Sequence, residues 1–195
     1  MSLAIRVVAE PAEEPLSLVQ AKDQLRVTND DSNELIASYI AAARRHLENT
    51  RGSAYVTQTR ERQLDCFSDY CGVIEIPRPP LQSVTWIKYI DPAGVEQTLS
   101  PTLYQVDARS EPGRIAPAYG QAWPSTRPQL GAVTIRYVCG YVAAAAVPEE
   151  VRQAMRLLVT DAWECKSETV IGTIVATRKA VDALLPVIDA LWIGR

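Results

Sequence analysis

Histidine is nearly absent from this 195-residue sequence, since His46 is its only one. Acid-base catalysis by an imidazole needs a positioned partner, and none can be named beside His46, which lies among charged residues typical of a solvated helix surface. The only close cysteine pair, Cys66 and Cys71, has no histidine near it to complete a zinc site. We therefore expect no catalytic histidine, no metal site and no cofactor.

Four cysteines in this length are too few for a disulfide framework, so we expect Cys66, Cys71, Cys139 and Cys165 to be reduced thiols. The first residues show no basic region followed by a long apolar core, and no apolar run approaches the roughly 20 residues of a membrane span. The expected site of synthesis and folding is a cytoplasm, without a membrane partner.

Basic residues are not in excess either, because the net charge is −3. A dedicated nucleic-acid binder would normally carry a basic patch or surplus. The sequence also lacks a glycine-rich phosphate loop, a Gly-x-Ser-x-Gly motif and a His-Glu-x-x-His motif. Its carboxylate pairs, Asp30-Asp31 and Glu149-Glu150, stand at expected helix starts, where the helix dipole explains them. We predict that the chain is not an enzyme, and a carboxylate hydrolase is the less favoured alternative.

Prolines organise the middle of the chain. Three of them fall in four residues, at Pro77, Pro79 and Pro80, and they exclude a helix and remove backbone donors. A strand is therefore expected to stop at Ile76 and a new one to start near Ser83.

Helical periodicity frames this region on both sides. Ser17 is a predicted N-cap for a helix of two to three turns. A second helix is expected from a capping box formed by Asp31 and Glu34, with an apolar stripe ending at Gly52. After Pro148 a long amphipathic helix is expected to pack on the second one.

Between these helices the pattern is that of strands. Residues 5–8 favour a short edge strand, 84–90 and 95–99 a hairpin, and 103–107, 113–115 and 132–138 three more strands. The fold class predicted is α+β: a helical bundle of about three to four helices with a small antiparallel β module inserted between the second and third long helices. The expected parts are an N-terminal helical part (1–55), the β module (56–140), a core helix (141–167), and a loop with an apolar docking segment (168–195).

Residues 56–65 are rich in long polar side chains, which favours a solvated or edge strand. The row containing Arg60 and Arg62 has two interpretations: a salt-bridged outer face, or half of a subunit contact. Tyr119 and Trp123 in the loop 118–124 are expected to cap one end of the β core, and a ligand platform is the alternative.

The end of the chain is unusually apolar. Its large apolar side chains are Val181, Leu184, Leu185, Val187, Ile188, Leu191, Trp192 and Ile193. Such a surface would be a solubility liability on a monomer. Either the segment folds back on its own core or, as we favour, it docks on a partner and becomes ordered there.

Several short stretches, taken in order, carry a resemblance to a known family. They are Ser17-Leu18-x-x-Ala21-Lys22 with Leu25-Arg26-Val27, Thr57-Gln58-Thr59, Ile76-Pro77-Arg78-Pro79-Pro80-Leu81-Gln82-Ser83-Val84, Tyr89-Ile90-Asp91-x-x-Gly94, Pro112-Gly113-Arg114-Ile115, and Val138-x-Gly140-Tyr141 with Val147-Pro148. In this order they resemble the head-tail connector proteins of tailed phages, also called adaptors or head-completion proteins, which have relatives in gene transfer agents. The resemblance covers about residues 15–165, and the proline stretch is its most specific part.

The resemblance implies a structural virion protein of the neck, assembled in a host cytoplasm. Connectors of this family form a ring, often of twelve subunits, beneath the portal protein, and extend the channel for double-stranded DNA towards the tail. DNA would pass through the lumen without specific binding. The partners implied are the portal protein, further copies of this chain and a stopper or other tail-side neck protein.

The family also implies that a C-terminal segment engages the portal, which assigns the apolar residues of 181–193 to docking. We assign Arg60, Arg62 and Arg78 to contacts between subunits. The alternative function is another ring component of the neck or tail, such as a stopper or a tail terminator.

Overall fold

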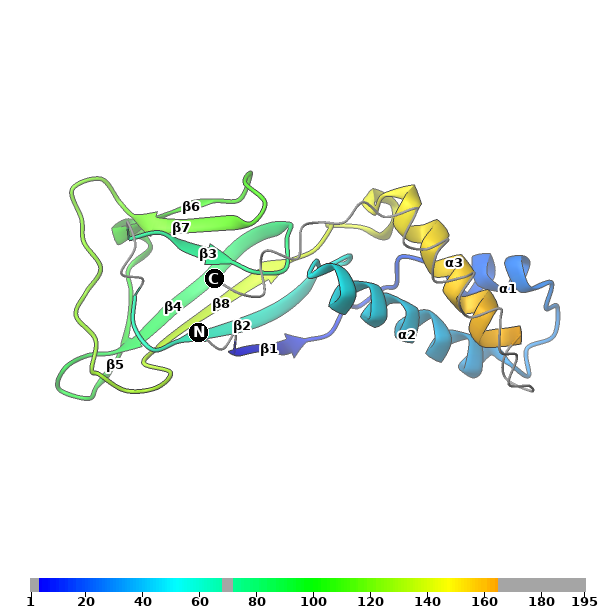
Figure 1. Cartoon of the computed structure of the whole chain (residues 1–195), viewed down its shortest axis with the longest axis horizontal. Coiled ribbons are helices and arrows are strands. Elements are labelled where there is room, and N and C mark those ends of the chain that lie inside the picture. Colours follow the sequence, from blue (N-terminus) through cyan, green and yellow to red (C-terminus); the bar gives the residue numbers. More distant parts are fainter. Residues whose placement is uncertain (1–3, 68–71, 165–195) are drawn as a thin grey trace. The chain divides into compact units, whose positions relative to one another are not determined.

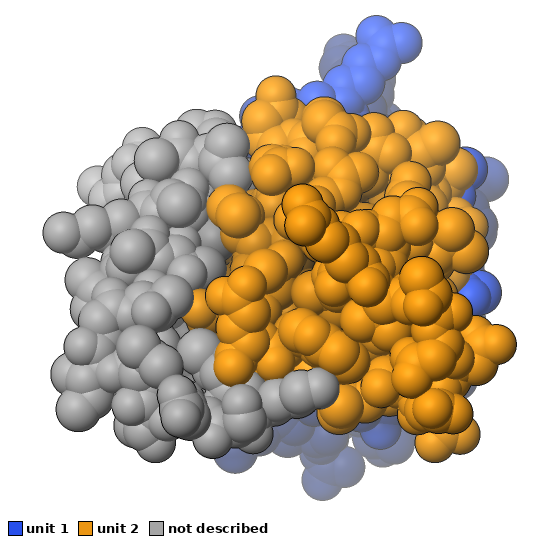
Figure 2. All heavy atoms as spheres, turned by 90° about the vertical axis from the view of Figure 1, so that its right-hand side faces the viewer, with its two compact units in different colours: residues 1–12, 57–142 blue, residues 13–56, 143–195 orange. Residues whose placement is uncertain are grey.

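The computed structural model describes residues 4–67 and 72–164, which contain three α-helices and eight β-strands (Figure 1). The chain divides into two compact units, drawn in different colours in Figure 2. Unit 1 comprises residues 1–12 and 57–142, and unit 2 comprises residues 13–56 and 143–195. Each unit is therefore built from two separate stretches of sequence.

Unit 1 contains two antiparallel sheets. The strands of the larger sheet, in spatial order, are β1 (Ala4–Ala9), β2 (Gln58–Leu64), β8 (Val133–Cys139), β4 (Leu81–Ile90) and β5 (Glu96–Thr98). Those of the smaller sheet are β3 (Ile74–Ile76), β7 (Gly113–Pro117) and β6 (Tyr104–Asp107). The hairpin of β4 and β5 and the strand at β1 confirm their predictions.

Alternation of side chains places the core of unit 1. In β8 every second residue is buried and the residues between are half-buried, as expected for a strand with one covered face. The smaller sheet contributes the buried Ile74, Ile76 and Ile115. Its Gly113 lies so near Leu81 of the larger sheet that a Cβ built there would be 2.5 Å from Leu81 Cδ2. The residue at this close approach of the two sheets is therefore a glycine, which has no side chain.

The proline stretch ends one strand and precedes the next, as predicted. β3 ends at Ile76, and β4 begins at Leu81, two residues before the predicted start. Between them Arg78 has a positive φ of 68°, and the Pro79–Pro80 peptide bond is cis.

The helices of unit 2 are α1 (Leu18–Leu25), α2 (Asn33–Arg51) and α3 (Glu149–Glu164). The predicted N-cap is confirmed: the Ser17 hydroxyl accepts from the Gln20 backbone N–H, and the Gln20 side chain accepts from the Ser17 backbone N–H. The predicted capping box of Asp31 and Glu34 is wrong, because α2 begins one residue later, after Ser32, whose side chain makes no capping bond.

The three helices bury a common core. Its large side chains are Leu16, Ile36, Ile40, Leu47, Val151, Met155 and Val159. α3 packs on α2, as predicted. α2 ends at Gly52, whose positive φ of 70° suits a residue without a Cβ. Within the described residues, no helix combines the length and apolarity needed to cross a bilayer.

The α+β class is confirmed, but the sheets are larger than the small β module that the sequence predicted. The prediction of an edge strand at residues 56–65 is wrong. β2 lies inside the larger sheet, between β1 and β8, and its Arg60 and Glu61 are buried.

Candidate functional site

One face of the larger sheet carries a line of charged and aromatic side chains. The strand register sets Arg6 opposite Glu61, Glu61 opposite Arg136 and Arg136 opposite Trp86. Directly paired residues of antiparallel strands point to the same face. These four side chains therefore lie side by side across β1, β2, β8 and β4.

Interactions join them and extend the line to β5. Glu61 binds the guanidinium groups of Arg6 and Arg136, each with an N–O distance of 2.5 Å. The Arg136 guanidinium lies 4.7 Å from the Trp86 ring centre, and Lys88 Nζ lies 5.2 Å from it. Lys88 then pairs with Glu96 at 2.6 Å. We call Arg6, Glu61, Arg136, Trp86, Lys88 and Glu96 the charged row.

Glu61 is the buried anion of the charged row, since only 5% of the residue is exposed. Burial raises its pKa, but hydrogen bonds from Arg136 and Arg6 outweigh burial, so the pKa lies below its usual value of 4.5. A general base works best with a pKa near the operating pH. Glu61 is thus suited to joining β2 to the strands on either side, β1 and β8, and not to proton transfer at neutral pH.

The three arginines that we assigned to subunit contacts lie around one buried phenol. Tyr137 is fully buried, and burial raises its pKa, while the positive charges of Arg60, Arg62 and Arg78 oppose that rise. Within the described residues the Tyr137 hydroxyl has no hydrogen-bond partner. The structure thus gathers Arg60, Arg62 and Arg78, although they are not adjacent in the sequence.

Two of these arginines have clear roles inside unit 1. Arg60, which is 7% exposed, donates from Nε to the Gln58 side-chain oxygen at 2.9 Å. Arg62 donates to the Glu75 carbonyl and so links β2 of one sheet to β3 of the other. Burial lowers the pKa of Arg62. That these residues mediate contacts between subunits stays a prediction.

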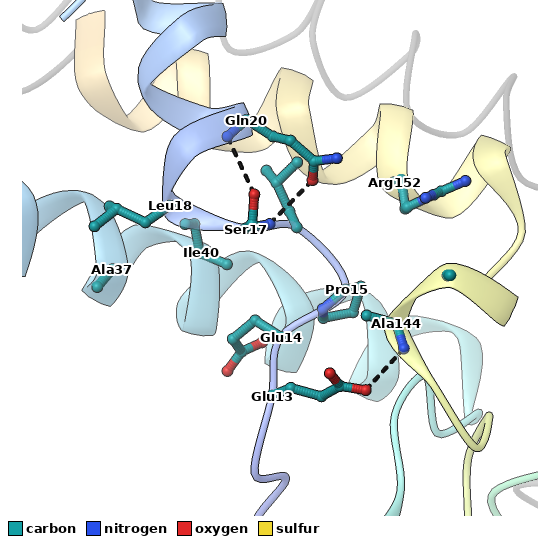
Figure 3. A pocket seen from close by; sticks show the side chains of 12 residues that line it. Glu13, Glu14, Pro15, Ser17, Leu18, Gln20, Ala37, Ile40, Ala144 and Arg152 are labelled. Atoms are coloured by element: carbon teal, nitrogen blue, oxygen red, sulfur yellow. Dashed lines mark hydrogen bonds between the residues drawn. The ribbon is translucent and has the colours of Figure 1, made fainter. Parts of the chain in front are cut away.

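Unit 2 contains an open hollow of about 470 Å³ at the start of α1 (Figure 3). Glu13 and Glu14 line it, but both are already engaged: Glu13 accepts from the Ala144 backbone N–H at 2.9 Å, and Glu14 pairs with Arg44 at 2.8 Å. Among the residues that the structure describes, no cluster of three potential metal ligands occurs. The residues that line the hollow therefore present no evident catalytic group.

The sequence did not reveal that Arg44 and Glu48 face the core. Each is 2% exposed, and they pair with each other at 3.0 Å. Glu48 also accepts from the Tyr55 backbone N–H at 3.1 Å. The signal was present in the spacing, because Arg44 and Glu48 continue the line of Ile36 and Ile40 at intervals of four residues.

The two aromatic residues of the loop 118–124, Tyr119 and Trp123, differ in their surroundings. Trp123 stacks on Phe67, with ring centres 4.7 Å apart, and donates its indole N–H to the Gly72 carbonyl at 2.6 Å. Trp123 therefore covers part of unit 1, as predicted. Tyr119 is fully exposed, so the same prediction is wrong for that residue. His46 is exposed on α2. The apolar residues of 181–193 assigned to portal docking lie outside the described residues.

No protein-family model and no curated protein matches this chain. Chains of solved structures do match it. A chain from the neck of the empty gene transfer agent (GTA) particle, computed with C6 symmetry, has a TM-score of 0.73 and 20% identity, covering 90% of this chain and 94% of that one. A chain of the virion of the native GTA particle has a TM-score of 0.73 and 19% identity, covering 93% and 94%.

A third similar chain comes from the neck of the native GTA particle, computed with C12 symmetry. Its TM-score is 0.69 and its identity 20%, over 94% of each chain. The likeness spans both units and nearly the whole of each neighbour. The fold of this chain is therefore the fold of chains found in GTA particles.

Proposed function

We propose that this chain is a structural neck protein of a phage-like particle, an adaptor that forms a ring beneath the portal and extends the DNA channel. The observation that carries the proposal is the likeness to chains from GTA necks over 90–94% of this chain and 94% of each neighbour. A likeness over the entire fold, and not over one common motif, supports a shared architectural role.

A ring of identical copies is the assembly that we propose. The similar neck structures were computed with sixfold and twelvefold symmetry. A cyclic assembly uses the same head-to-tail interface around the ring, so every copy presents one complementary pair of surfaces. Twelve copies are the number we propose here, in keeping with the family that the sequence resembles.

The chemistry of the described residues fits a passive channel component. The ionisable groups of the charged row are paired with one another, and the lowered pKa of Glu61 keeps it ionised. The chain is mildly acidic, with a net charge of −3. Such a protein repels the DNA backbone more than it binds it, which suits a conduit whose cargo must pass.

We propose that the apolar residues of 181–193 dock on the portal. The test is electron microscopy of the full chain mixed with the portal protein from the same genome, beside a variant lacking residues 180–195. The proposal expects a new ring layer on the portal with the full chain and none with the truncated chain. Circular dichroism of the truncated chain should retain the helical signal of α1 to α3.

Point variants separate a lost docking surface from a damaged fold. Leu184→Ser with Leu185→Ser should weaken portal decoration, whereas Asp189→Ser in the same segment should leave it unchanged. A full chain that adds no layer to the portal contradicts the adaptor role. If that chain instead binds the far side of an adaptor-decorated portal, the stopper function replaces it.

A further inference from the structure

The larger sheet of unit 1 ends in two open edges. β1 pairs only with β2, and β5 pairs only with β4, within the residues that the structure describes. β1 is mostly exposed, including Val7 at 37% and Val8 at 40%. An apolar edge strand of six residues is a template for pairing with another chain, and native proteins usually cover or block it.

The opposite edge is equally accessible. All three residues of β5, Glu96 to Thr98, are exposed. Its polar sequence disfavours non-specific pairing, yet its backbone groups remain available to a partner whose charge matches Glu96. One open edge is thus apolar apart from Arg6, and the other is polar.

The charged row gives the two edges opposite signs. It begins on β1 with Arg6, whose side chain is 74% exposed, and ends on β5 with Glu96, whose side chain is 57% exposed. The register puts Arg6 on the face that carries Glu61 and Arg136, and Glu96 on the face that carries Lys88. Both ends therefore lie on the same face of the sheet.

We propose that β1 of one copy pairs with β5 of the next, so that the sheets of neighbouring subunits join edge to edge and the charged row continues between them. The inference rests on the proposed ring and names its interface. The occupant of each edge is a second copy of this chain. Main-chain hydrogen bonds would supply affinity, and the meeting of Arg6 with Glu96 would supply the direction.

The topology is compatible with this arrangement. The sheet has five antiparallel strands, so β1 and β5 run in the same direction. A neighbour in the same orientation pairs its β1 parallel to β5 and keeps its charged row on the same side. Such an interface is heterologous, which is the kind that closes into rings.

Self-pairing of like edges is disfavoured on charge. A β1–β1 contact brings one Arg6 towards another, and a β5–β5 contact brings together two copies of Glu96. Like charges opposite each other destabilise a strand pair. The charges therefore favour head-to-tail pairing over a symmetric dimer.

Cross-linking of full-length protein on the portal distinguishes these contacts. In a background with Cys66, Cys71 and Cys165 changed to serine, Val7→Cys and Gln97→Cys together are treated with a flexible bismaleimide. The proposal expects a ladder of covalent multimers for the double variant, and no cross-link for either single variant. A dimer from Val7→Cys alone would show β1–β1 pairing and overturn the proposal.

Charge exchange tests the same contact without thiols. Arg6→Glu and Glu96→Arg should each lower the fraction of ring-decorated portals about tenfold. Combining them should restore most of that fraction, although the ion pairs with Glu61 and Lys88 inside each subunit stay broken. Restoration within one subunit is excluded, because β2, β8 and β4 separate the two side chains. Arg109→Glu, on an exposed loop, is the matched charge reversal and should change nothing. Thermal unfolding of each variant checks the fold.

The outcomes separate the two proposals. Portals that carry a ring but yield no ladder and no charge rescue overturn the β1–β5 interface and leave the adaptor role standing. Portals that carry no ring even with the unsubstituted chain overturn the adaptor role and the interface with it. A ladder together with charge rescue supports both.

Discussion

At the scale of single residues, the contacts of unit 1 leave little freedom at two positions. Gly113 in β7 and Leu81 in β4 touch across the two sheets. Glu61 is held by two guanidinium groups from the strands on either side. Glycine is required at position 113 because β4 lies too close for a side chain, and a carboxylate is required at position 61 because two neighbouring strands each place an arginine there.

Gly113→Ala should destabilise the protein by about 1–3 kcal/mol, because the new methyl group must displace packed core atoms. The added Cβ would lie 2.5 Å from Leu81 Cδ2 and 2.6 Å from Leu81 Cβ. Urea unfolding measures the free energy. The double variant with Leu81→Gly should lose less than the sum of the single losses, since every Leu81 atom that clashes with the new methyl group, the Cβ included, is removed. Additive losses would contradict a direct clash.

Glu61→Gln should lower the free energy of unfolding at pH 7 by about 1–3 kcal/mol, because a buried charged acceptor is lost. The pKa of Glu61 is lowered in the folded state, so its ionised form stabilises the protein above the usual value of 4.5. This stabilisation disappears as the pH falls through 4.5 towards the lower folded pKa.

The gap between the native chain and Glu61→Gln should therefore shrink on acidification. Urea unfolding at several pH values between 7 and 3 measures it. Glu111→Gln, at an exposed loop position, is the control and should give a small gap at every pH. A gap for Glu61→Gln that stays constant with pH would contradict the lowered pKa.

At the scale of elements, periodicity and turn chemistry predicted most of the fold. Ser17 and Gly52 marked helix ends correctly, and the prolines separated β3 from β4. The prediction failed for β2, because long polar side chains such as Arg60 read as solvated in sequence. In the structure Arg60 lies buried beside Tyr137. Burial of an arginine depends on partners from distant strands, which propensity does not encode.

The same limit applies to the candidate site. The charged row joins residues from five strands, and its members became neighbours only through the strand register. The sequence singled out Arg60 and Arg62 in this region but not Glu61 as the centre of an ion-pair group. A carboxylate flanked by two arginines in sequence gives no sign that its actual partners are Arg6 and Arg136.

Ser17→Ala tests the capping of α1. Loss of the reciprocal hydrogen bonds with Gln20 should cost about 1 kcal/mol in urea unfolding. Ser38→Ala in α2 is the matched control. The Ser38 hydroxyl bonds to the Leu35 carbonyl at an exposed helical position, where alanine is the better helix former. Equal losses for the two variants would contradict a specific capping role.

At the scale of the whole molecule, the division of the chain matches the proposed assembly. Unit 1 carries the charged row and the two open sheet edges, and unit 2 has the helical core and includes residues 181–193 in its sequence. The proposed subunit contact and the proposed portal contact therefore belong to different parts of the chain. The effects of variants at the sheet edges and of variants in residues 180–195 on the fraction of ring-decorated portals are expected to be independent of each other.

The charge of the whole chain makes a further prediction about DNA. With a net charge of −3, the free protein should bind a double-stranded DNA duplex more weakly than a Kd of about 10⁻⁴ M at 0.15 M salt. Fluorescence anisotropy of a labelled duplex measures this. Asp23→Lys, Asp31→Lys and Glu34→Lys together make the net charge positive at exposed sites, and this variant should bind in a salt-dependent way. Micromolar binding by the native chain would contradict a passive channel, because it requires a basic surface concentrated enough to overcome the repulsion from the rest of the molecule.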